Sequence, residues 1–296
     1  MKQTILVYGA NGAQMNAGTK ELINAGHTVR VLCRTEENAA DWAAQGAETV
    51  IGEMSNQDSL VKASQGCDAI FLLVPLFRDS EELGITYGLN SLNAAKEAGI
   101  TRVVWNTGGP IMDETSETDA GAVILRQLRA NEFSFLGLTP ITYMENLFGP
   151  WTLAGLNDGK LAYPTPVDFK MQWVAAKDFG RVADKALQGE LPNAVLPLGG
   201  PAGLDGNDLA RILGEALGKS LTFETMPAPE FQAYLAKGAG ERVAGIVGGM
   251  YGAIQADAAP FQPGFVTDAS DIEQRFGLTQ TSLEDWSAEH KAILSA

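Results

Sequence analysis

The stretch Ile5-Leu-Val-Tyr-Gly9-Ala-Asn-Gly12-Ala-Gln-Met15, close to the start of the chain, decides the fold. A short apolar strand runs directly into a turn that carries two glycines, and a helical pattern follows. Glycine at position 9 permits a tight turn, and glycine at position 12 lets the backbone approach phosphate oxygens closely. The amides and the dipole of the following helix N-terminus favour negative charge. The stretch therefore predicts a strand, a turn and a helix that together hold the pyrophosphate of a nicotinamide dinucleotide.

The turn differs from the usual glycine pattern in one place. Met15 stands where a third glycine would allow the helix to pack closely on the strand. We expect Met15 to fill a gap or to displace the loop, while the small residues up to Gly18 absorb part of the change. The turn residues that we expect to contact the cofactor are Gly9, Asn11, Gly12, Ala13 and Gln14.

Short apolar, β-branched runs alternate with helical patterns through the first half of the chain. This alternation predicts an α/β fold with a doubly wound parallel sheet of the Rossmann type, covered by helices on both faces. The expected strands are Ile5–Tyr8, Val29–Leu32, Glu48–Ile51, Ala69–Val74 and Arg102–Trp105. The expected helices lie near Gly18–Ala25, Asn38–Ala44, Ser59–Ser64 and Glu81–Ala98.

The second half of the chain is less regular. Its pattern predicts a smaller C-terminal α+β lobe on the substrate side. We expect residues 1–150 to form the NAD(P)-binding domain and residues 151–296 to form the lobe, with interleaved contributions and an approximate boundary. The further helices are expected at Ala120–Ala130, Ala176–Leu187, Gly206–Leu217, Pro229–Ala236 and Leu283–Ile293, and the strands at Val195–Leu198 and Leu221–Thr225, with an apolar run at Leu136–Ile141.

Composition narrows the class of protein. Hydrophobic residues make up 45% of the 296 residues, so a sizeable core can form. A formal net charge of -15 argues against a nucleic-acid partner and against attachment to a membrane through basic patches. The two cysteines, Cys33 and Cys67, form no CxxC pair and are expected to be small buried residues, and no spacing suggests a metal site. Without a signal-peptide pattern or a membrane-spanning run we expect a cytoplasmic protein, and homo-oligomerisation stays open.

The end of the second expected strand bears on the choice of cofactor. An acidic residue there would bind a ribose 2′-hydroxyl and favour NAD, but the chain has Arg34, which can pair with the 2′-phosphate of NADP. Glu36 and Glu37 follow and would weaken that attraction. We therefore favour NADP(H) over NAD(H), with Arg34 as a solvated surface charge as the alternative.

Other expected strands end in residues suited to the same cofactor, because ligands of such sheets bind at the carboxyl ends of the strands. Glu53 can accept a bond from the adenine amino group, and Met54 can pack along the ring. The segment Val74-Pro75-Leu76 is expected beside the ribose and the pyrophosphate, and the polar side chains of Asn106 and Thr107 are expected at the nicotinamide end.

Several of these motifs, taken together, carry a family resemblance. They are Gly9–Gln14, Arg34, Gly52–Met54, Thr142–Leu147, Trp286 with His290, and Gly206–Gly218 followed by Leu221–Pro227. Over almost its whole length the chain resembles the NmrA-like group of atypical short-chain dehydrogenases/reductases. The resemblance implies either an NAD(P)H-dependent reductase of quinones, aromatic dyes or plant phenolics, or a cofactor-sensing regulator. It further implies that Tyr143 and Asn146 line the nicotinamide and substrate side, and that Asp178 caps a helix of the smaller lobe.

The acid/base pair that short-chain dehydrogenases commonly use is missing. None of the six tyrosines has a lysine four residues later, and the position where reductase relatives carry that lysine falls near Gly121. Hydride transfer to a quinone or a conjugated carbonyl needs mainly positioning. The expected catalytic residues are Tyr143, Asn106 and Thr107. The expected substrate-binding residues are Trp151, Gln172, Trp173, Met250 and Tyr251, and for the aromatic residues and Met250 core packing is at least an equal alternative.

Three functions fit these observations. The first is an NADPH-dependent oxidoreductase that reduces a small aromatic, quinone-like or enone substrate. The second is a non-catalytic NADP(H)-sensing regulatory protein, and the third is an isomerase or cyclase that uses the same fold without redox chemistry. A catalytic role is not expected for His27 or His290, and no Gly-x-Ser-x-Gly motif indicates hydrolysis.

Overall fold

The computed structural model describes residues 2–75 and 80–295. By internal contacts the chain divides into two compact units. The first comprises Met1–Pro140 and Ala176–Pro197, and the second comprises Ile141–Ala175 and Leu198–Ala296. The chain thus crosses between the units after Pro140, after Ala175 and after Pro197.

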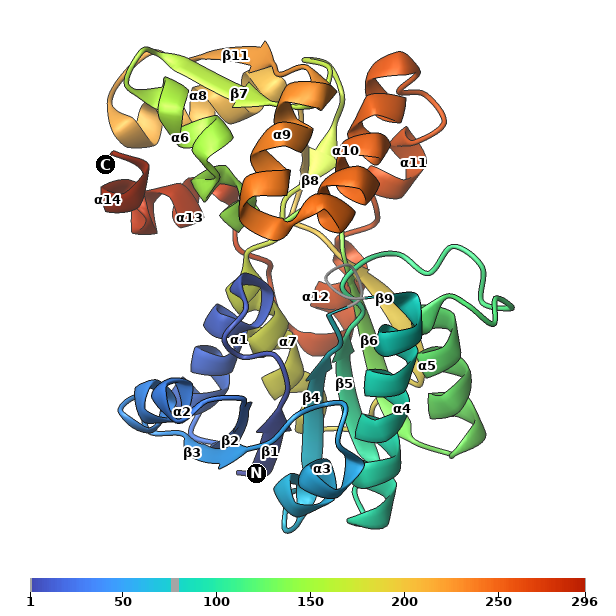
Figure 1. Ribbon diagram of the computed structural model, residues 1–296. Coiled ribbons are helices and arrows are strands. Elements are labelled where there is room, and N and C mark those ends of the chain that lie inside the picture. Colours follow the sequence, from blue (N-terminus) through green and yellow to red (C-terminus); the bar gives the residue numbers. More distant parts are fainter. Residues whose placement is uncertain (1, 76–79, 296) are drawn as a thin grey trace. The chain divides into compact units, whose positions relative to one another are not determined.

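A seven-stranded sheet in the order β3-β2-β1-β4-β5-β6-β9 organises the first unit (Figure 1). The registered pairs from β3 through to β6 are all parallel. The strand order reverses between β1 and β4, which is the point where such sheets bind ligands. The strands are β1 (Thr4–Val7), β2 (Thr28–Cys33), β3 (Glu48–Ile51), β4 (Ala69–Leu73), β5 (Arg102–Asn106), β6 (Ser134–Pro140) and β9 (Ala194–Leu198).

Helices cover both faces of this sheet, as the near-continuous apolar strands require. Alternate strand residues such as Leu6, Ile70 and Trp105 pack with side chains of α3, α4 and α5 in one apolar cluster. On the other side α1 packs along α7 (Figure 1). The helices are α1 (Ala13–Asn24), α2 (Glu36–Ala43), α3 (Gln57–Ser64), α4 (Glu81–Glu97), α5 (Ala120–Ala130) and α7 (Ala176–Leu187). The predicted doubly wound α/β fold is confirmed.

The position of α7 corrects one expectation. This helix belongs to the first unit and not to the smaller lobe, and Asp178 lies in its first turn and not at the N-cap. The reason is a close contact between two helices. A Cβ atom at Gly180 would overlap the backbone oxygen of Gly18 in α1, so only glycine permits this packing. The small residue that brings α1 close to its neighbour is therefore Gly18, while Met15 is fully buried.

The second unit packs helices around two short sheets. Strand β7 (Lys160–Tyr163) pairs with β11 (Thr222–Thr225) in parallel, and β8 (Met171–Gln172) pairs with β10 (Gly203–Leu204) in antiparallel fashion. The helical elements are η1 (Met144–Phe148), α6 (Pro150–Leu156), α8 (Gly206–Leu217), α9 (Ala228–Ala239), α10 (Glu241–Ala256), α11 (Gln262–Phe265), α12 (Ser270–Phe276), α13 (Leu283–Glu289) and α14 (Lys291–Leu294).

Two local differences from the expected elements have physical causes. The helix expected at residues 283–293 is broken into α13 and α14 because His290, at φ -104° and ψ 16°, leaves the helical conformation. The helix α10 was not predicted, because its glycines obscure an otherwise apolar helical pattern.

Cys33 and Cys67 are buried thiols, as expected, and burial raises the pKa of both. Within residues 2–75 and 80–295, no helix combines the length and the apolar character needed to cross a membrane.

Candidate functional site

The turn between β1 and α1 has the backbone geometry of a phosphate-binding loop. Gly9 adopts φ +77°, a left-handed conformation that favours glycine. Its carbonyl accepts the amide of Gly12 at 2.9 Å, which closes the turn. Gly12 is extended and precedes the helix without any side-chain cap, so the helix N-terminus faces out with bare amides.

The first amides of α1 are free to bind an anion. The amides of Met15 and Asn16 both donate to the carbonyl of Gly12, at 3.1 and 3.0 Å. For the amides of Ala13 and Gln14, the described part of the chain offers no acceptor. Unpaired amides at the positive end of a helix dipole suit a pyrophosphate group. The residues present therefore fit a dinucleotide.

Met15 packs beneath this turn and contacts a residue from another strand end. Its side chain is fully buried, and Asn106 Nδ2 lies 3.8 Å from Met15 Sδ. Asn106 Oδ1 in turn accepts the amide of Gly108 at 3.0 Å. The methionine thus fills the gap and joins the phosphate turn to the end of β5.

Asn106 and Thr107, which we expected at the nicotinamide end, are both buried, with 0% and 1% of their surface exposed. The Thr107 hydroxyl donates to the carbonyl of Gly109 at 2.7 Å and lies 3.1 Å from Thr139 Oγ1. Both side chains therefore use polar atoms in hydrogen bonds within the protein. This arrangement favours a role in holding the loop that follows β5.

Arg34 lies directly after β2 with an exposed side chain. It forms no ion pair or hydrogen bond with any residue in the described ranges 2–75 and 80–295. Thr35 caps α2 by accepting the amide of Asn38 at 3.3 Å, which places Glu36 and Glu37 in the first helical turn. The helix dipole stabilises carboxylates at that position, so the Arg34 guanidinium stays available to an external anion.

The loop after β3 lies at the same edge of the sheet. The side chain of Glu53 is exposed, and its amide donates to Ser59 Oγ at 3.2 Å. The carbonyl of Met54 accepts a bond from Asn90 Nδ2 of α4 at 3.0 Å. At the end of β4, Val74 is buried and Pro75 is partly buried, while Leu76 lies outside the described residues.

In the second unit, Tyr143 immediately precedes η1 and Asn146 lies within it. Tyr143 is 8% exposed, and its neighbour Met144 donates its amide to the carbonyl of Val174 at 2.9 Å. The Asn146 amide donates to the carbonyl of Tyr143 at 3.1 Å. These backbone bonds fix the segment next to the strand-like residues around position 174.

Most of the expected substrate-binding residues lie in the apolar interior of the second unit. Trp173 packs edge-on against Tyr163 at 4.9 Å between ring centroids, and Trp151 packs edge-on against Phe231 at 4.9 Å. The hydroxyls of Tyr163 and Tyr251 lie 3.0 Å apart. Burial raises the pKa of Tyr163 to about 12 and that of Tyr251 well above its usual value. Met250, the residue before Tyr251 in α10, is partly buried against this core.

The polar side chains of this interior differ in whether they have hydrogen-bond partners. Both ends of the Gln172 carboxamide are bonded: its Nε2 donates to the Thr267 carbonyl at 3.0 Å, and its Oε1 accepts the Thr267 amide at 2.9 Å. The buried indole nitrogens of Trp151 and Trp173, by contrast, have no acceptor within the described residues. Gln172 thus favours a structural role, whereas the two indoles retain unused donors.

The C-terminal residues of the family resemblance meet the segment after Tyr143. The indole of Trp286 donates to Glu145 Oε1 at 3.2 Å and stacks on Phe148 at 4.8 Å between ring centroids. His290 packs on the same indole at 4.7 Å and has Nδ1 2.8 Å from the Trp286 carbonyl. These residues hold the second unit together.

His27 also has a structural position. Its Nδ1 accepts the amide of Gln3 at 3.2 Å, and its Nε2 lies 2.9 Å from Asp184 Oδ1 of α7. A neutral imidazole with the proton on Nε2 satisfies both contacts. The histidine therefore fastens α7 to the start of the sheet.

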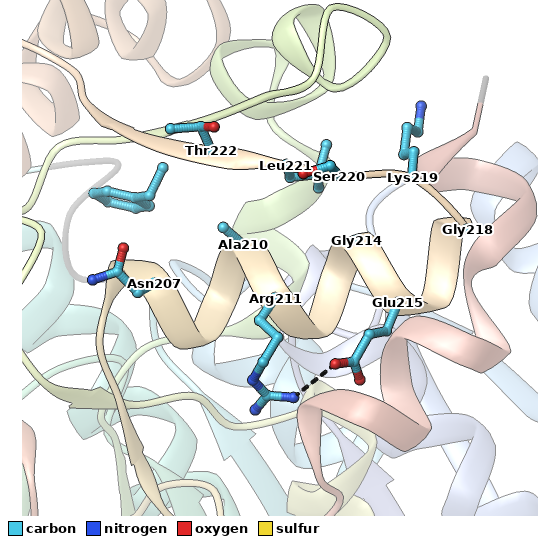
Figure 2. A pocket seen from close by; sticks show the side chains of 11 residues that line it. Asn207, Ala210, Arg211, Gly214, Glu215, Gly218, Lys219, Ser220, Leu221 and Thr222 are labelled. Carbon is cyan, nitrogen blue, oxygen red and sulfur yellow. Dashed lines mark hydrogen bonds and ion pairs between the residues drawn. The ribbon is translucent and has the colours of Figure 1, made fainter.

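A surface groove of about 690 Å³ lies along one face of α8 and the chain that leads into β11 (Figure 2). Arg211 and Glu215, which line it, form an ion pair at 3.2 Å. None of the cofactor or substrate residues expected from the sequence lines this groove. All of its lining residues belong to the second unit.

A profile of the NmrA-like family matches residues 1–288. The chain belongs to the NmrA-like family. It is 27% identical over 224 residues to the NAD(P)H azoreductase of Xenophilus azovorans, with 74% of this chain and 76% of that protein covered. Among solved structures, the triphenylmethane reductase of Citrobacter sp. complexed with NADP(H) is similar, with a TM-score of 0.75, 20% identity, and coverage of 97% and 99%. A mutant of NmrA has a TM-score of 0.72 at 16% identity, with coverage of 97% and 95%. At these identities the likeness to the two structures concerns the fold.

Proposed function

We propose that this NmrA-like protein is an NADPH-dependent oxidoreductase that reduces a small aromatic, quinone-like or enone substrate. The observation that carries the proposal is the combination of bare amides at the start of α1 with an unpaired Arg34 at the end of β2. The names of the azoreductase relative and of the triphenylmethane reductase neighbour support a reductase of planar acceptors.

In this proposal the bound dihydronicotinamide supplies a hydride, and the chain positions cofactor and acceptor. A quinone that takes up the hydride and one proton becomes a hydroquinone, and water can deliver that proton. The bare amides of Ala13 and Gln14 would hold the pyrophosphate. Glu53 and Met54 would contact the adenine, and Val74 and Pro75 the ribose side.

The environment of Gly121 supports chemistry without a tyrosine–lysine pair. A Cβ atom at Gly121 would lie 3.1 Å from Ile111 Cγ1 and 3.1 Å from Asp119 Oδ1, which caps α5. A lysine at position 121 would place its Cβ atom in this crowded space, so the neighbouring side chains would have to move. Acceptors that need no dedicated proton donor, such as quinones and conjugated dyes, suit such a site best.

Tyr143 and Asn146 are our candidates for the substrate side, on the family resemblance. Asn106 and Thr107 enter the proposal as residues that position the loop after β5, because their polar atoms are bonded within the protein. The unused indole donors of Trp151 and Trp173 support a role for the second unit in binding a hydrogen-bond acceptor of the substrate.

The preference for NADP(H) over NAD(H) rests on Arg34. A guanidinium can bind a phosphate through two parallel hydrogen bonds, which the 2′-hydroxyl of NADH cannot provide. We expect Arg34→Ala to raise the dissociation constant for NADPH by about tenfold or more and to leave that for NADH unchanged. Calorimetric titration of both cofactors measures this, with Lys20→Ala as a charge-matched control.

Turnover is tested by following NADPH absorbance with a panel of quinones, azo dyes and enones. Consumption with at least one acceptor is the expected result. Tight NADPH binding without any consumption would contradict the reductase proposal. That outcome would favour the regulatory alternative, which the absence of a Tyr-x-x-x-Lys pair from the sequence also supports. A sensor must also discriminate between NADPH and NADP+ in affinity.

A further inference from the structure

A buried tryptophan contacts the phosphate turn from a separate element. Trp42 lies in the last turn of α2 with 1% of its surface exposed. Its Nε1–H donates to Oδ1 of Asn11 at 3.3 Å. Asn11 is exposed and stands between Gly9 and Gly12 in the turn. This bond joins the second βα unit of the sheet to the loop that follows the first strand.

The chemistry of the two partners decides which way the Asn11 amide faces. An indole nitrogen only donates, so it selects the oxygen of a carboxamide and never the NH2 group. With Oδ1 turned to Trp42, Nδ2 and its two protons face elsewhere. Within residues 2–75 and 80–295, Asn11 Nδ2 has no acceptor. The side chain thus presents donors next to the bare amides of Ala13 and Gln14.

We propose that Trp42 is a positioning residue that fixes the Asn11 carboxamide so that Nδ2 donates to an oxygen of the bound dinucleotide. The oxygen belongs to a phosphate or to a ribose hydroxyl, which are the acceptors such a cofactor carries near this turn. The inference rests on the proposed function, because it requires that a dinucleotide binds at all. It adds a residue from α2 that touches no cofactor atom itself.

The link also explains how the two halves of the cofactor pocket keep their spacing. The helix that carries Trp42 begins immediately after Arg34 and Thr35, at the edge that we assign to the 2′-phosphate. The same helix buries Ala39 together with Trp42. A bond from α2 to the turn therefore ties the loop that receives the pyrophosphate to the strand end that reads the ribose.

The test is a double-mutant cycle on the full chain, with dissociation constants for NADPH and NADH measured by calorimetry. Trp42→Phe keeps a buried aromatic ring but removes the indole N–H together with part of the ring volume, and the tryptophan control below accounts for the lost volume. Asn11→Ala removes the donors. We expect Asn11→Ala to raise the dissociation constant for NADPH about tenfold and Trp42→Phe to raise it several-fold. In the Asn11→Ala background, Trp42→Phe should have no further effect, because the two residues act through one bond.

Two further variants separate orientation from packing. Trp105→Phe is a matched control in the same unit, since Trp105 is fully buried and its Nε1 has no acceptor among the described residues. It should leave the dissociation constants unchanged. Asn11→Asp keeps an oxygen for Trp42 but replaces the donors by a negative charge, so it should weaken binding more than Asn11→Ala does.

The outcomes separate cleanly. If Trp42→Phe leaves both constants unchanged, or weakens binding equally with and without the Asn11 side chain, the inference is overturned. If the wild-type protein binds neither cofactor, the proposed function itself fails. A loss confined to NADPH identifies the 2′-phosphate as the acceptor, and an equal loss for NADH identifies an oxygen that both cofactors share; either result supports the role of Trp42.

Discussion

The phosphate turn of the first unit and the aromatic interior of the second unit show two ways in which residues relate to function. In the turn, backbone conformation supports the proposed phosphate binding: Gly9 is left-handed, and the amides after Gly12 are bare. In the interior, side chains pack on each other: Trp173 and Tyr251 both lie edge-on against Tyr163. A backbone that must bend one way allows few residue types, whereas an aromatic ring serves a core and a binding site equally well.

The largest effect is expected where the first region depends on a helix contact. Gly180→Ala places a methyl group against the backbone oxygen of Gly18, and backbone cannot yield as a side chain can. We expect the free energy of unfolding to fall by about 3 kcal/mol. Denaturant unfolding measures this value.

Gly189→Ala is the matched control for that substitution, because a Cβ atom there meets nothing within 4 Å. It should leave the free energy of unfolding nearly unchanged. If both variants unfold alike, the contact between Gly18 and Gly180 does not determine how α1 is held in the first unit.

The strands of the sheet were predicted well because each of them coincides with a short apolar run in the sequence. The observed β3 has the predicted bounds, and β1 is shifted by a single residue at each end. The helix α1 begins at Ala13, earlier than the predicted start near Gly18, because residues 13–17 show no apolar periodicity. The membership of α7 in the first unit could not be predicted, since it depends on a contact between Gly18 and Gly180 that no local pattern encodes.

For the candidate site, the sequence located residues whose positions follow from local turns and strand ends, and missed contacts that form only in the folded chain. The turn glycines and Arg34 lie where the sequence suggested, at the ends of β1 and β2, because strand order and turn chemistry fix those positions. Trp42 was not among the expected residues. Its signal, a tryptophan in a short helix after Arg34, becomes meaningful only when the fold brings it to Asn11. Gln172 was expected at the substrate, but its bonds to Thr267 are visible only in three dimensions.

The second region can be tested through the ionisation of its tyrosines. A buried hydroxyl ionises with difficulty, so the pKa of Tyr163 is raised to about 12 from 10.0. A raised folded-state pKa means that this contribution to stability is complete below pH 10 and is lost as the pH rises through 12. We expect the free energy of unfolding to fall over that interval, and Tyr163→Phe should make the fall less steep.

Tyr8 in the first unit also has a pKa raised by burial. The pH dependence of the wild type alone therefore does not isolate Tyr163, and two variants must be compared. The measurement is the free energy of unfolding of the wild type and of Tyr163→Phe between pH 9 and 12. Tyr234→Phe, at a partly exposed position on α9, is the control. An unchanged slope in Tyr163→Phe would mean that water reaches the hydroxyl, and the interior would then have to be described as an open site.

The smallest expected effect concerns the helix that the sequence did not reveal. Gly245 lies on the exposed face of α10, and a Cβ atom there meets nothing within 4 Å. Since alanine is the better helix former and no contact opposes it, Gly245→Ala should raise the free energy of unfolding by about 0.5 to 1 kcal/mol. Gly248→Ala is the opposing variant, because its Cβ atom would lie 2.8 Å from Gln232 Cβ of α9. A gain at position 245 with a loss at position 248 would show that α10 packs on α9 through one face only. A loss at both positions would mean that the face bearing Gly245 is covered, and that glycine in this helix, like glycine in the phosphate turn, is required by a close approach.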